Sequence, residues 1–545
     1  MIFAKRYHVI ILILFLISCS GPKETEDKKT VFRYNEAGGI TSLDPAYSRN
    51  LANIWACNML YNGLVEADDS LRIRPAIARS WDISDDGKTY TFHLRQDVFF
   101  HDHPMFPEGQ GRKVRAGDFV RSFSRIIDPQ TASPGAWVFA QVKMPADSAF
   151  RAPDDSTFVI RLNEAFPPFL GILSMKYCSV IPWDIVEKAG KDFRSQPCGT
   201  GPFRFQYWKE GVKLVFRKND LYFEYDTTGE RLPYLDAVSV TFLMDKQAAF
   251  LEFVKGNLDF LSGLDPSYKD EILTPGGQLN PKYNKHCYLL KTPYLNNEYL
   301  GFLLDTTHDA GKSAFIKNVK FRKAINYGFD RKRMIRYLRN NIGTPGIYGI
   351  VPPGLPSFDT GAMKGYDYRP DSVRKLLREA GMEGKNPEIT LSTTSDYLDL
   401  CRFIQHQLGE FGIITEISVN PPATNAQLVA NSKVQFFRAS WIADYPDAEN
   451  YLSLFYSRNF SPSGPNYTHF TDPLFDRLYE TARNTVDPEL RYELYQTMNR
   501  IMMEKAPVVV LYYDEVLRFI HNDFIGIGAN PINLLDLRRA RKITD

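Results

Sequence analysis

The sequence predicts a mixed α/β protein of at least two lobes that are joined by more than one crossing of the chain. Strand-like and helix-like segments alternate along its whole length. The 545-residue chain leaves about 515 residues beyond residue 30, more than one hydrophobic core usually serves. Because no long Pro, Ser or Gly linker and no internal repeat divides this body, we expect the lobes to be interwoven.

Periodicity places the individual elements. Alternating or β-branched and aromatic runs predict strands over residues 30–36, 89–95, 157–162, 212–218, 237–244, 299–305, 388–394, 434–441 and 508–513. Apolar residues at helical spacing predict two helices, one with Phe321, Ala324, Ile325 and Phe329, the other with Val373, Leu376, Leu377 and Ala380 before Gly381. The proline- and glycine-rich segment 344–356 is expected to run irregularly over the surface.

The N-terminus has the arrangement of an export signal. Lys5 and Arg6 precede an uninterrupted apolar run over residues 9–17, followed by Ser18 and Cys19. The run is shorter than the roughly 20 residues that a membrane-spanning helix needs. Residues 16–19 read LISC and resemble the bacterial lipobox, so we expect Cys19 to be lipidated, with the polar stretch 20–30 as a tether. The alternative is an ordinary secreted protein whose signal happens to end in cysteine.

Charge and cysteine content narrow the function classes. Loss of residues 1–19 removes two basic and no acidic residues, so 64 Lys and Arg balance 64 Asp and Glu. A neutral body argues against a nucleic-acid partner. Five cysteines remain after Cys19, so at least one is unpaired; Cys178 and Cys198 could close a short loop, but the pairing stays open.

The sequence lacks the common catalytic and metal-binding motifs. The GxSxG, HExxH and EF-hand patterns are absent, and no CxxC spacing occurs. His101 and His103 would share one side of an extended segment and could hold a metal, although a solvated turn is the simpler interpretation. We therefore expect no catalysis, no resident metal and no cofactor.

Residues 440–456 form the strongest candidate binding segment. An apolar strand from residue 434 leads into Asp444, which Trp441 and Tyr445 flank. A carboxylate at such a strand end suits a ligand ammonium. Arg438 precedes Asp444 by six residues, and an even offset along a strand places both on one face, a pattern that suits a zwitterion. Alternatively, Asp444 caps the next helix and Arg438 pairs with a neighbouring acid.

Motifs in order along the body resemble the family 5 extracellular solute-binding proteins of ABC importers, which include oligopeptide- and dipeptide-binding proteins. The resemblance is carried by SLDPA at 42–46, GTGPFRF at 199–205, SWIADYPDAENYL at 440–452 and the longer stretches 60–102, 114–129, 320–335 and 365–381. It implies a two-lobed periplasmic-binding-protein (Venus-flytrap) fold with an extra subdomain in the first lobe, closing over a solute at a hinge.

The resemblance also implies boundaries and roles. After the signal peptide (1–19) and tether (20–30) inferred above, the implied parts are lobe I (31–73, 196–292 and 512–545), its extra subdomain (74–195) and lobe II (293–511). Asp444 would hold a peptide's α-ammonium and Arg438 its carboxylate, with Trp441 and Trp137 in pocket-wall segments. We expect a lipid-anchored monomer in the cell envelope, with its body outside the cytoplasmic membrane, that delivers peptides to permease and ATPase subunits.

The sequence departs from the oligopeptide-binding pattern at several positions. A carboxylate-binding histidine would fall near Leu398, a pocket tryptophan near residues 421–424, and Ile442 replaces a disulfide cysteine. Family members also carry nickel chelates, haem, glutathione or oligosaccharides, so these remain alternative cargoes. A sensory or chaperone-like accessory without a transport partner is a further alternative.

Overall fold

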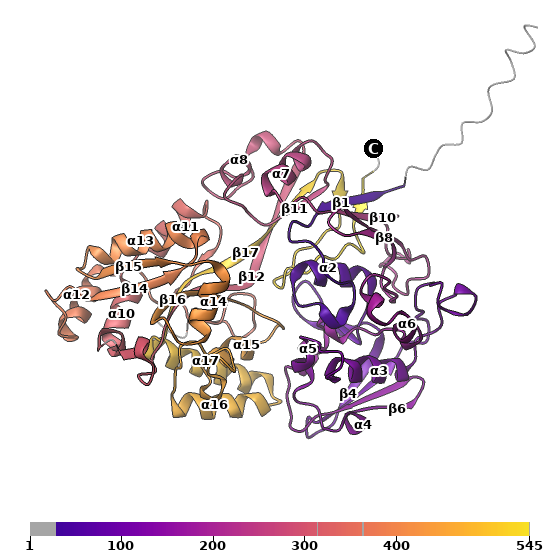
Figure 1. Cartoon of the computed structure of the whole chain (residues 1–545), viewed down its shortest axis with the longest axis horizontal. Coiled ribbons are helices and arrows are strands. Elements are labelled where there is room, and N and C mark those ends of the chain that lie inside the picture. The colour runs from indigo at the N-terminus through magenta and orange to yellow at the C-terminus, as the bar shows by residue number, and fades with distance from the viewer. Residues whose placement is uncertain (1–28, 313, 362–364, 544–545) are drawn as a thin grey trace, which may run out of the picture.

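The computed structural model describes residues 29–312, 314–361 and 365–543, and it has two lobes (Figure 1). One lobe, indigo to magenta, contains the strands near the N-terminus, and the other, orange to ochre, contains the helices from α10 onward. A single eleven-stranded sheet passes through both lobes in the order β15-β14-β16-β12-β17-β11-β1-β10-β9-β8, with β13 paired to β17. The chain is therefore interwoven, as expected from the absence of a single linker.

The strands of the large sheet divide into three groups. The first lobe holds β1 (Val31–Asn35), β8 (Phe203–Lys209), β9 (Lys213–Lys218), β10 (Ala237–Thr241) and β11 (Phe260–Ser262). The second holds β13 (Thr344–Pro345), β14 (Glu388–Thr393), β15 (Ile414–Val419) and β16 (Phe436–Ile442). Two long strands, β12 (Cys287–Phe302) and β17 (Val508–His521), run antiparallel between the lobes.

The pairing of β12 with β17 is interrupted where the lobes meet. Its register shifts between Pro293 and Asn297. Proline has no N–H to donate to a sheet ladder, so an irregularity at this position is expected. Pro293 and the polar residues after it also break the apolar pattern, which is why the predicted strand began only at residue 299. The strand predicted over 508–513 likewise continues to His521.

Smaller strands and the helices complete the lobes. The remaining strands are β2 (Val65–Ala67) with β3 (Ile73–Pro75), β18 (Phe524–Ile525) with β19 (Arg541–Lys542), and a four-stranded sheet of β4 (Ala78–Ile83), β5 (Thr89–Leu94), β7 (Thr157–Arg161) and β6 (Phe150–Asp154). The first-lobe helices are α2 (Leu51–Leu60), α3 (Ala116–Ile127), α4 (Ala146–Ala149), α5 (Phe169–Leu173), α6 (Trp183–Ala189), α7 (Lys246–Val254) and α8 (Lys269–Ile272). The second-lobe helices are α9 (Ala314–Lys317), α10 (Val319–Tyr327), α11 (Arg331–Leu338), α12 (Pro370–Glu379), α13 (Leu398–Gly409), α14 (Pro422–Ala430), α15 (Glu449–Leu452), α16 (Pro473–Asn484) and α17 (Pro488–Lys505).

The two helices predicted from periodicity are confirmed as α10 and α12. Phe321, Ala324 and Ile325 are fully buried on α10. Gly381 follows α12 with a φ of +68°, the left-handed conformation that ends many helices at glycine. Within the described residues, no helix has the length and apolarity needed to cross a membrane.

Three local expectations need correction or completion. The segment 344–356 is irregular but not a surface segment, because Ile350 and Val351 are buried and Tyr513 Oη donates a hydrogen bond to Gly349 O at 2.8 Å. His101 does not lie in a solvated turn: its ring is buried, Nε2 donates to Gly201 O at 2.9 Å, and burial lowers its pKa to about 4. Among the described cysteines, all five are buried and free of disulfides.

An aromatic core holds α3 against the four-stranded sheet. The ring of Phe123 lies 4.7 Å from that of Phe139, 5.6 Å from Phe150 and 5.5 Å from Phe158, measured between centroids. Replacing Phe123 with alanine is expected to lower the free energy of unfolding by about 3–5 kcal/mol, since the site is fully enclosed. Urea denaturation measures this change. The control is Phe99→Ala, at a side chain 41% exposed, where a comparable loss would contradict the assignment of this core.

Candidate ligand-binding site

A cavity of about 710 Å³ lies between the lobes, alongside the crossing strands. Its wall includes Ser262 and Leu264 from the first lobe, Tyr397 from the second, and Glu298 and Asp514 from the crossing strands. The volume is within the range of small-molecule sites. Because both lobes contribute to the wall, relative movement of the lobes would change the shape of this cavity.

Arg438 does not line this cavity but contacts two residues of its wall, Glu298 and Tyr397. It lies on β16, which pairs with β12, and its Nη2 forms an ion pair with Glu298 on β12. Its guanidinium carbon sits 3.3 Å from the centroid of the Tyr397 ring, a cation–π contact. Both charged side chains are buried, with 13% of Arg438 and 3% of Glu298 exposed. One donor stays unused, because Arg438 Nε has no hydrogen-bond partner within the described part of the chain.

The Glu298 carboxylate is held in an unfavourable environment for its charge. Burial raises its pKa to about 7, against the opposing influence of Arg438. Asp514 raises the pKa further, and Arg339, which pairs with Asp514 at 2.6 Å, lowers it. Glu298 therefore lies among a second acid and two arginines, and burial is the influence that brings its pKa near neutral pH.

Asp444 lies just beyond the end of β16 and carries an uncompensated charge. Its side chain reaches solvent, yet the surrounding protein removes part of its hydration and raises its pKa, while a hydrogen bond with Asn450 opposes this shift. Across residues 29–312, 314–361 and 365–543, no cation forms an ion pair with it. Burial raises the pKa of the Tyr177 hydroxyl in the first lobe, and the nearby Asp444 charge raises it further. A partly dehydrated carboxylate without a counter-ion favours a cationic ligand group.

Asn450 fixes the backbone and side chain that frame Asp444. Its Oδ1 accepts hydrogen bonds from Trp441 Nε1 at 2.8 Å and from the Asp444 backbone N–H at 3.3 Å. Asn450 itself is buried at the start of α15. Asp444 does not cap this helix: the N–H of Glu449 is bound instead by Asp447 Oδ1 at 2.9 Å. The side chain of Asp444 is thus free of the capping role that was its alternative interpretation.

Tyr445 and Trp137 meet between the two lobes. Their ring centroids are 6.3 Å apart with an interplanar angle of 37°. Tyr445 is buried and its hydroxyl donates to Glu449, whereas Trp137 is 41% exposed. A neighbouring contact, Arg483 with the Phe166 ring at 5.2 Å, also joins the lobes. Tyr445 therefore packs between the lobes, and Trp137 retains a ring surface open to a ligand.

The predicted site residues thus fall into two places. One place, where the second lobe touches the first, holds Trp441, Asp444, Tyr445 and Trp137. The other holds Arg438, which lies behind the cavity wall and pairs with Glu298. The alternative interpretation holds for Arg438, which does pair with a neighbouring acid. Glu298 and Tyr397 were missed, and the only signal for Glu298 was an acid inside a strand-forming region. Cys19 lies outside the described residues.

Comparison with known proteins identifies the family. Residues 72–462 match the family described as bacterial extracellular solute-binding proteins, family 5 Middle. The chain belongs to this family. Its two-lobed α/β fold agrees with that assignment, and the family's members bind solutes outside the cell.

Individual family members resemble this chain over most of its length. It is 25% identical to the dipeptide-binding protein of Escherichia coli strain K12, over 87% of both chains. It is 30% identical to heme-binding protein A of Haemophilus influenzae, over 82% of this chain and 80% of that protein. Among solved structures, HbpA2 from Haemophilus parasuis matches with a TM-score of 0.81 at 21% identity, covering 94% of this chain and 100% of that one. The resemblance in fold is therefore stronger than the resemblance in sequence.

Proposed function

We propose that this protein captures peptides or peptide-like solutes with a free α-ammonium and delivers them to the permease and ATPase subunits of an ABC importer. It acts by closure of the two lobes and performs no catalysis. Lipidated Cys19 holds it at a membrane, and the tether over residues 20–30 lets the monomeric body reach the permease. The closed, ligand-bound state is the state that the permease recognises.

The observation that carries the proposal is the uncompensated Asp444 carboxylate between the lobes. The α-ammonium of a peptide supplies the missing positive charge and up to three hydrogen-bond donors. Trp441 is already oriented beside it by Asn450, and Trp137 offers an aromatic surface from the opposite lobe. These groups recognise features that every peptide shares, so selectivity for side chains can stay broad.

Arg438 is proposed to meet the ligand's carboxylate. Its pairing with Glu298 does not exclude this role, because Nε remains without a hydrogen-bond partner in the described structure and Glu298 gains a proton near pH 7. A ligand carboxylate then replaces the charge that Glu298 loses. The crossing strands β12 and β17, irregular between Pro293 and Asn297, are proposed as the hinge for closure.

Native mass spectrometry of the full-length protein in detergent tests the ligand class. We expect bound mass to be released on denaturation as a ladder of short peptides, since main-chain recognition selects length and termini more than side chains. Addition of a defined tripeptide should replace this ladder by one complex. Release of a single sugar or chelate, with no displacement by tripeptide, would contradict a peptide receptor.

A tetrapyrrole is the second candidate cargo, favoured by the 30% identity to heme-binding protein A of Haemophilus influenzae. It needs an apolar surface for the ring and cationic groups for its propionates. The wall of the 710 Å³ cavity is polar and holds six acids against three basic side chains, which suits such a ligand poorly. A haem titration followed by visible absorption separates the two cargoes: a saturable spectral shift that survives excess tripeptide supports haem.

A further inference from the structure

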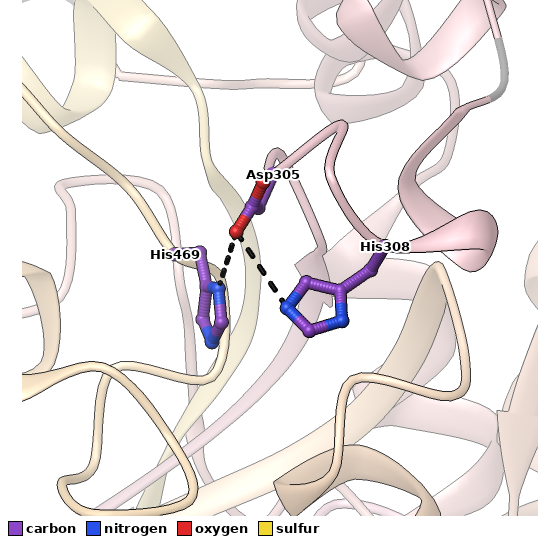
Figure 2. Close-up of side chains that lie close together, drawn as sticks. All are labelled: Asp305, His308 and His469. Atoms are coloured by element: carbon purple, nitrogen blue, oxygen red, sulfur yellow. Dashed lines mark hydrogen bonds and ion pairs between the residues drawn. The ribbon is translucent and has the colours of Figure 1, made fainter.

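Asp305, His308 and His469 form a cluster away from the residues proposed for peptide binding. Asp305 and His308 follow the end of β12, and His469 lies in the loop before α16. Figure 2 shows both imidazole rings directed at the same oxygen of Asp305. His469 Nδ1 lies 3.1 Å from Asp305 Oδ2, and His308 Nε2 lies 3.7 Å from it. One ligand atom from each of the three residues lies within 4.8 Å of the other two.

His469 is held so that its Nδ1 faces the Asp305 carboxylate. Its Nε2 is 3.1 Å from the carbonyl oxygen of Ser461, which can only accept a hydrogen bond, and it also lies 3.1 Å from Ser461 Oγ and 3.3 Å from Ser432 Oγ, which can donate one. With a proton on Nε2, the ring donates to Ser461 O and presents the Nδ1 lone pair beside Asp305, as a metal-ligating histidine does. With the proton on Nδ1, the ring donates to Asp305 and Nε2 accepts from a serine hydroxyl. The ring therefore fits metal ligation through Nδ1 as well as a metal-free hydrogen bond to Asp305, and zinc binding decides between the two.

The surroundings of His469 match those of a metal-binding histidine. Such histidines commonly donate the N–H of the non-ligating nitrogen to a carbonyl, which sets tautomer and ring orientation. Here Ser461 O provides the acceptor, and the Phe460 ring stacks on the imidazole with centroids 4.4 Å apart and an interplanar angle of 1°. His469 is 4% exposed and has a left-handed φ of +48°, so the loop holds this ring in an uncommon backbone conformation.

The donor set selects the class of metal. Two imidazole nitrogens and one carboxylate suit Zn²⁺ and similar transition ions, whereas Ca²⁺ and Mg²⁺ prefer oxygen ligands. Zinc bonds of about 2.0–2.1 Å in a tetrahedron place ligand atoms about 3.3 Å apart, close to the spacings of Asp305 from both histidines. His308 is 41% exposed, so solvent reaches this side of the cluster and could supply a fourth ligand.

We propose that Asp305, His308 and His469 bind a Zn²⁺ ion with three protein ligands and one solvent ligand. The two loops are already aligned for this, because Leu304 N donates to Thr468 O at 2.9 Å. The ion ties the end of β12, a strand that passes between the lobes, to the second lobe. This site is independent of Asp444 and of the peptide hypothesis.

Zinc titration of the full-length, chelator-treated protein in detergent tests this site. We expect one equivalent of Zn²⁺ to bind by calorimetry and to raise the thermal midpoint. His308→Ala, a change at a partly exposed loop residue that should leave folding intact, and Asp305→Asn are each expected to weaken zinc binding at least tenfold. The matched control is His406→Ala, at a side chain 79% exposed on α13, which should bind zinc as the wild type does.

Two results overturn the proposal. The first is absence of saturable zinc binding, which would assign the cluster to hydrogen bonds between Asp305 and the histidines without a metal ion. The second is wild-type zinc affinity in either His308→Ala or Asp305→Asn, which would place the ion elsewhere. Because zinc binding and peptide binding are measured separately, failure of one leaves the other standing.

Discussion

Asp444→Asn is expected to weaken binding of a peptide with a free N-terminus by about 30-fold or more. Loss of a desolvated charge partner typically costs about 2–5 kcal/mol, and 1.4 kcal/mol corresponds to a tenfold change in affinity. Asparagine keeps the size of the side chain, so the hydrogen bonds of Asn450 to this turn should persist. Isothermal titration calorimetry with one tripeptide measures the change.

An N-acetylated form of the same tripeptide separates charge recognition from general damage. The wild type should bind it weakly, and Asp444→Asn should reduce its affinity little further, because the ammonium is already absent. Asp396→Asn is the matched control: Asp396 is an exposed acid at the wall of the 710 Å³ cavity. If Asp396→Asn, and not Asp444→Asn, abolished discrimination between the two peptides, the ammonium site would lie in that cavity.

Arg438→Met is expected to lower the free energy of unfolding by about 3–5 kcal/mol at pH 8. The substitution leaves Glu298 as a buried, unpaired carboxylate, 3% exposed. Methionine retains much of the apolar part of the arginine side chain. The loss of free energy of unfolding therefore measures the removal of the guanidinium charge. Urea denaturation followed by circular dichroism measures the change, and Arg458→Met, which breaks an exposed pair with Glu480, should cost less than about 1 kcal/mol.

The pH dependence of this variant gives the sharper test. Burial raises the pKa of Glu298 to about 7 in the folded protein, above its ordinary 4.5. The contribution of protonated Glu298 to the free energy of unfolding is therefore fully present below about pH 4.5, and it is lost as the pH rises through 7. Without Arg438 the folded pKa rises further, so the defect should be largest at pH 8 and small at pH 5. A loss of stability that does not change with pH would contradict the assignment to Glu298. Adding Glu298→Gln to the Arg438→Met variant should restore most of the lost free energy of unfolding.

Local patterns predicted the local elements well. Helix α10 forms because its apolar residues recur on one face, and α12 ends where Gly381 can adopt a positive φ. The long strands were predicted only in part. Pro293 and the asparagines that follow are not typical of a strand, although β12 pairs with both β16 and β17. The burial of residues 344–356 could not be predicted either, since proline and glycine indicate an irregular path and not its depth.

For the candidate site, the sequence predicted residues that are close in the chain but not their partners from distant segments. Asp444 and Trp441 are neighbours in sequence, so their spacing alone brought them together. Arg438 was recognised, but its partners Glu298 and Tyr397 come from segments 140 and 41 residues away, and no periodicity relates them. His469 lies 164 residues from Asp305, so their contact had no signal in the sequence.

The sequence by itself determined the mixed α/β class, the interwoven lobes, the family and the position of Asp444. Each of these depends on residues close in the chain or on the order of motifs along it. Only the tertiary structure decided which charges have partners. Arg438 is paired with Glu298, Asp444 has no cationic partner among the residues that the structure describes, and Asp305 faces two imidazoles. The physical reason is that burial and electrostatic interaction depend on distance in space, and in this fold the crossing strands bring together side chains far apart in the chain.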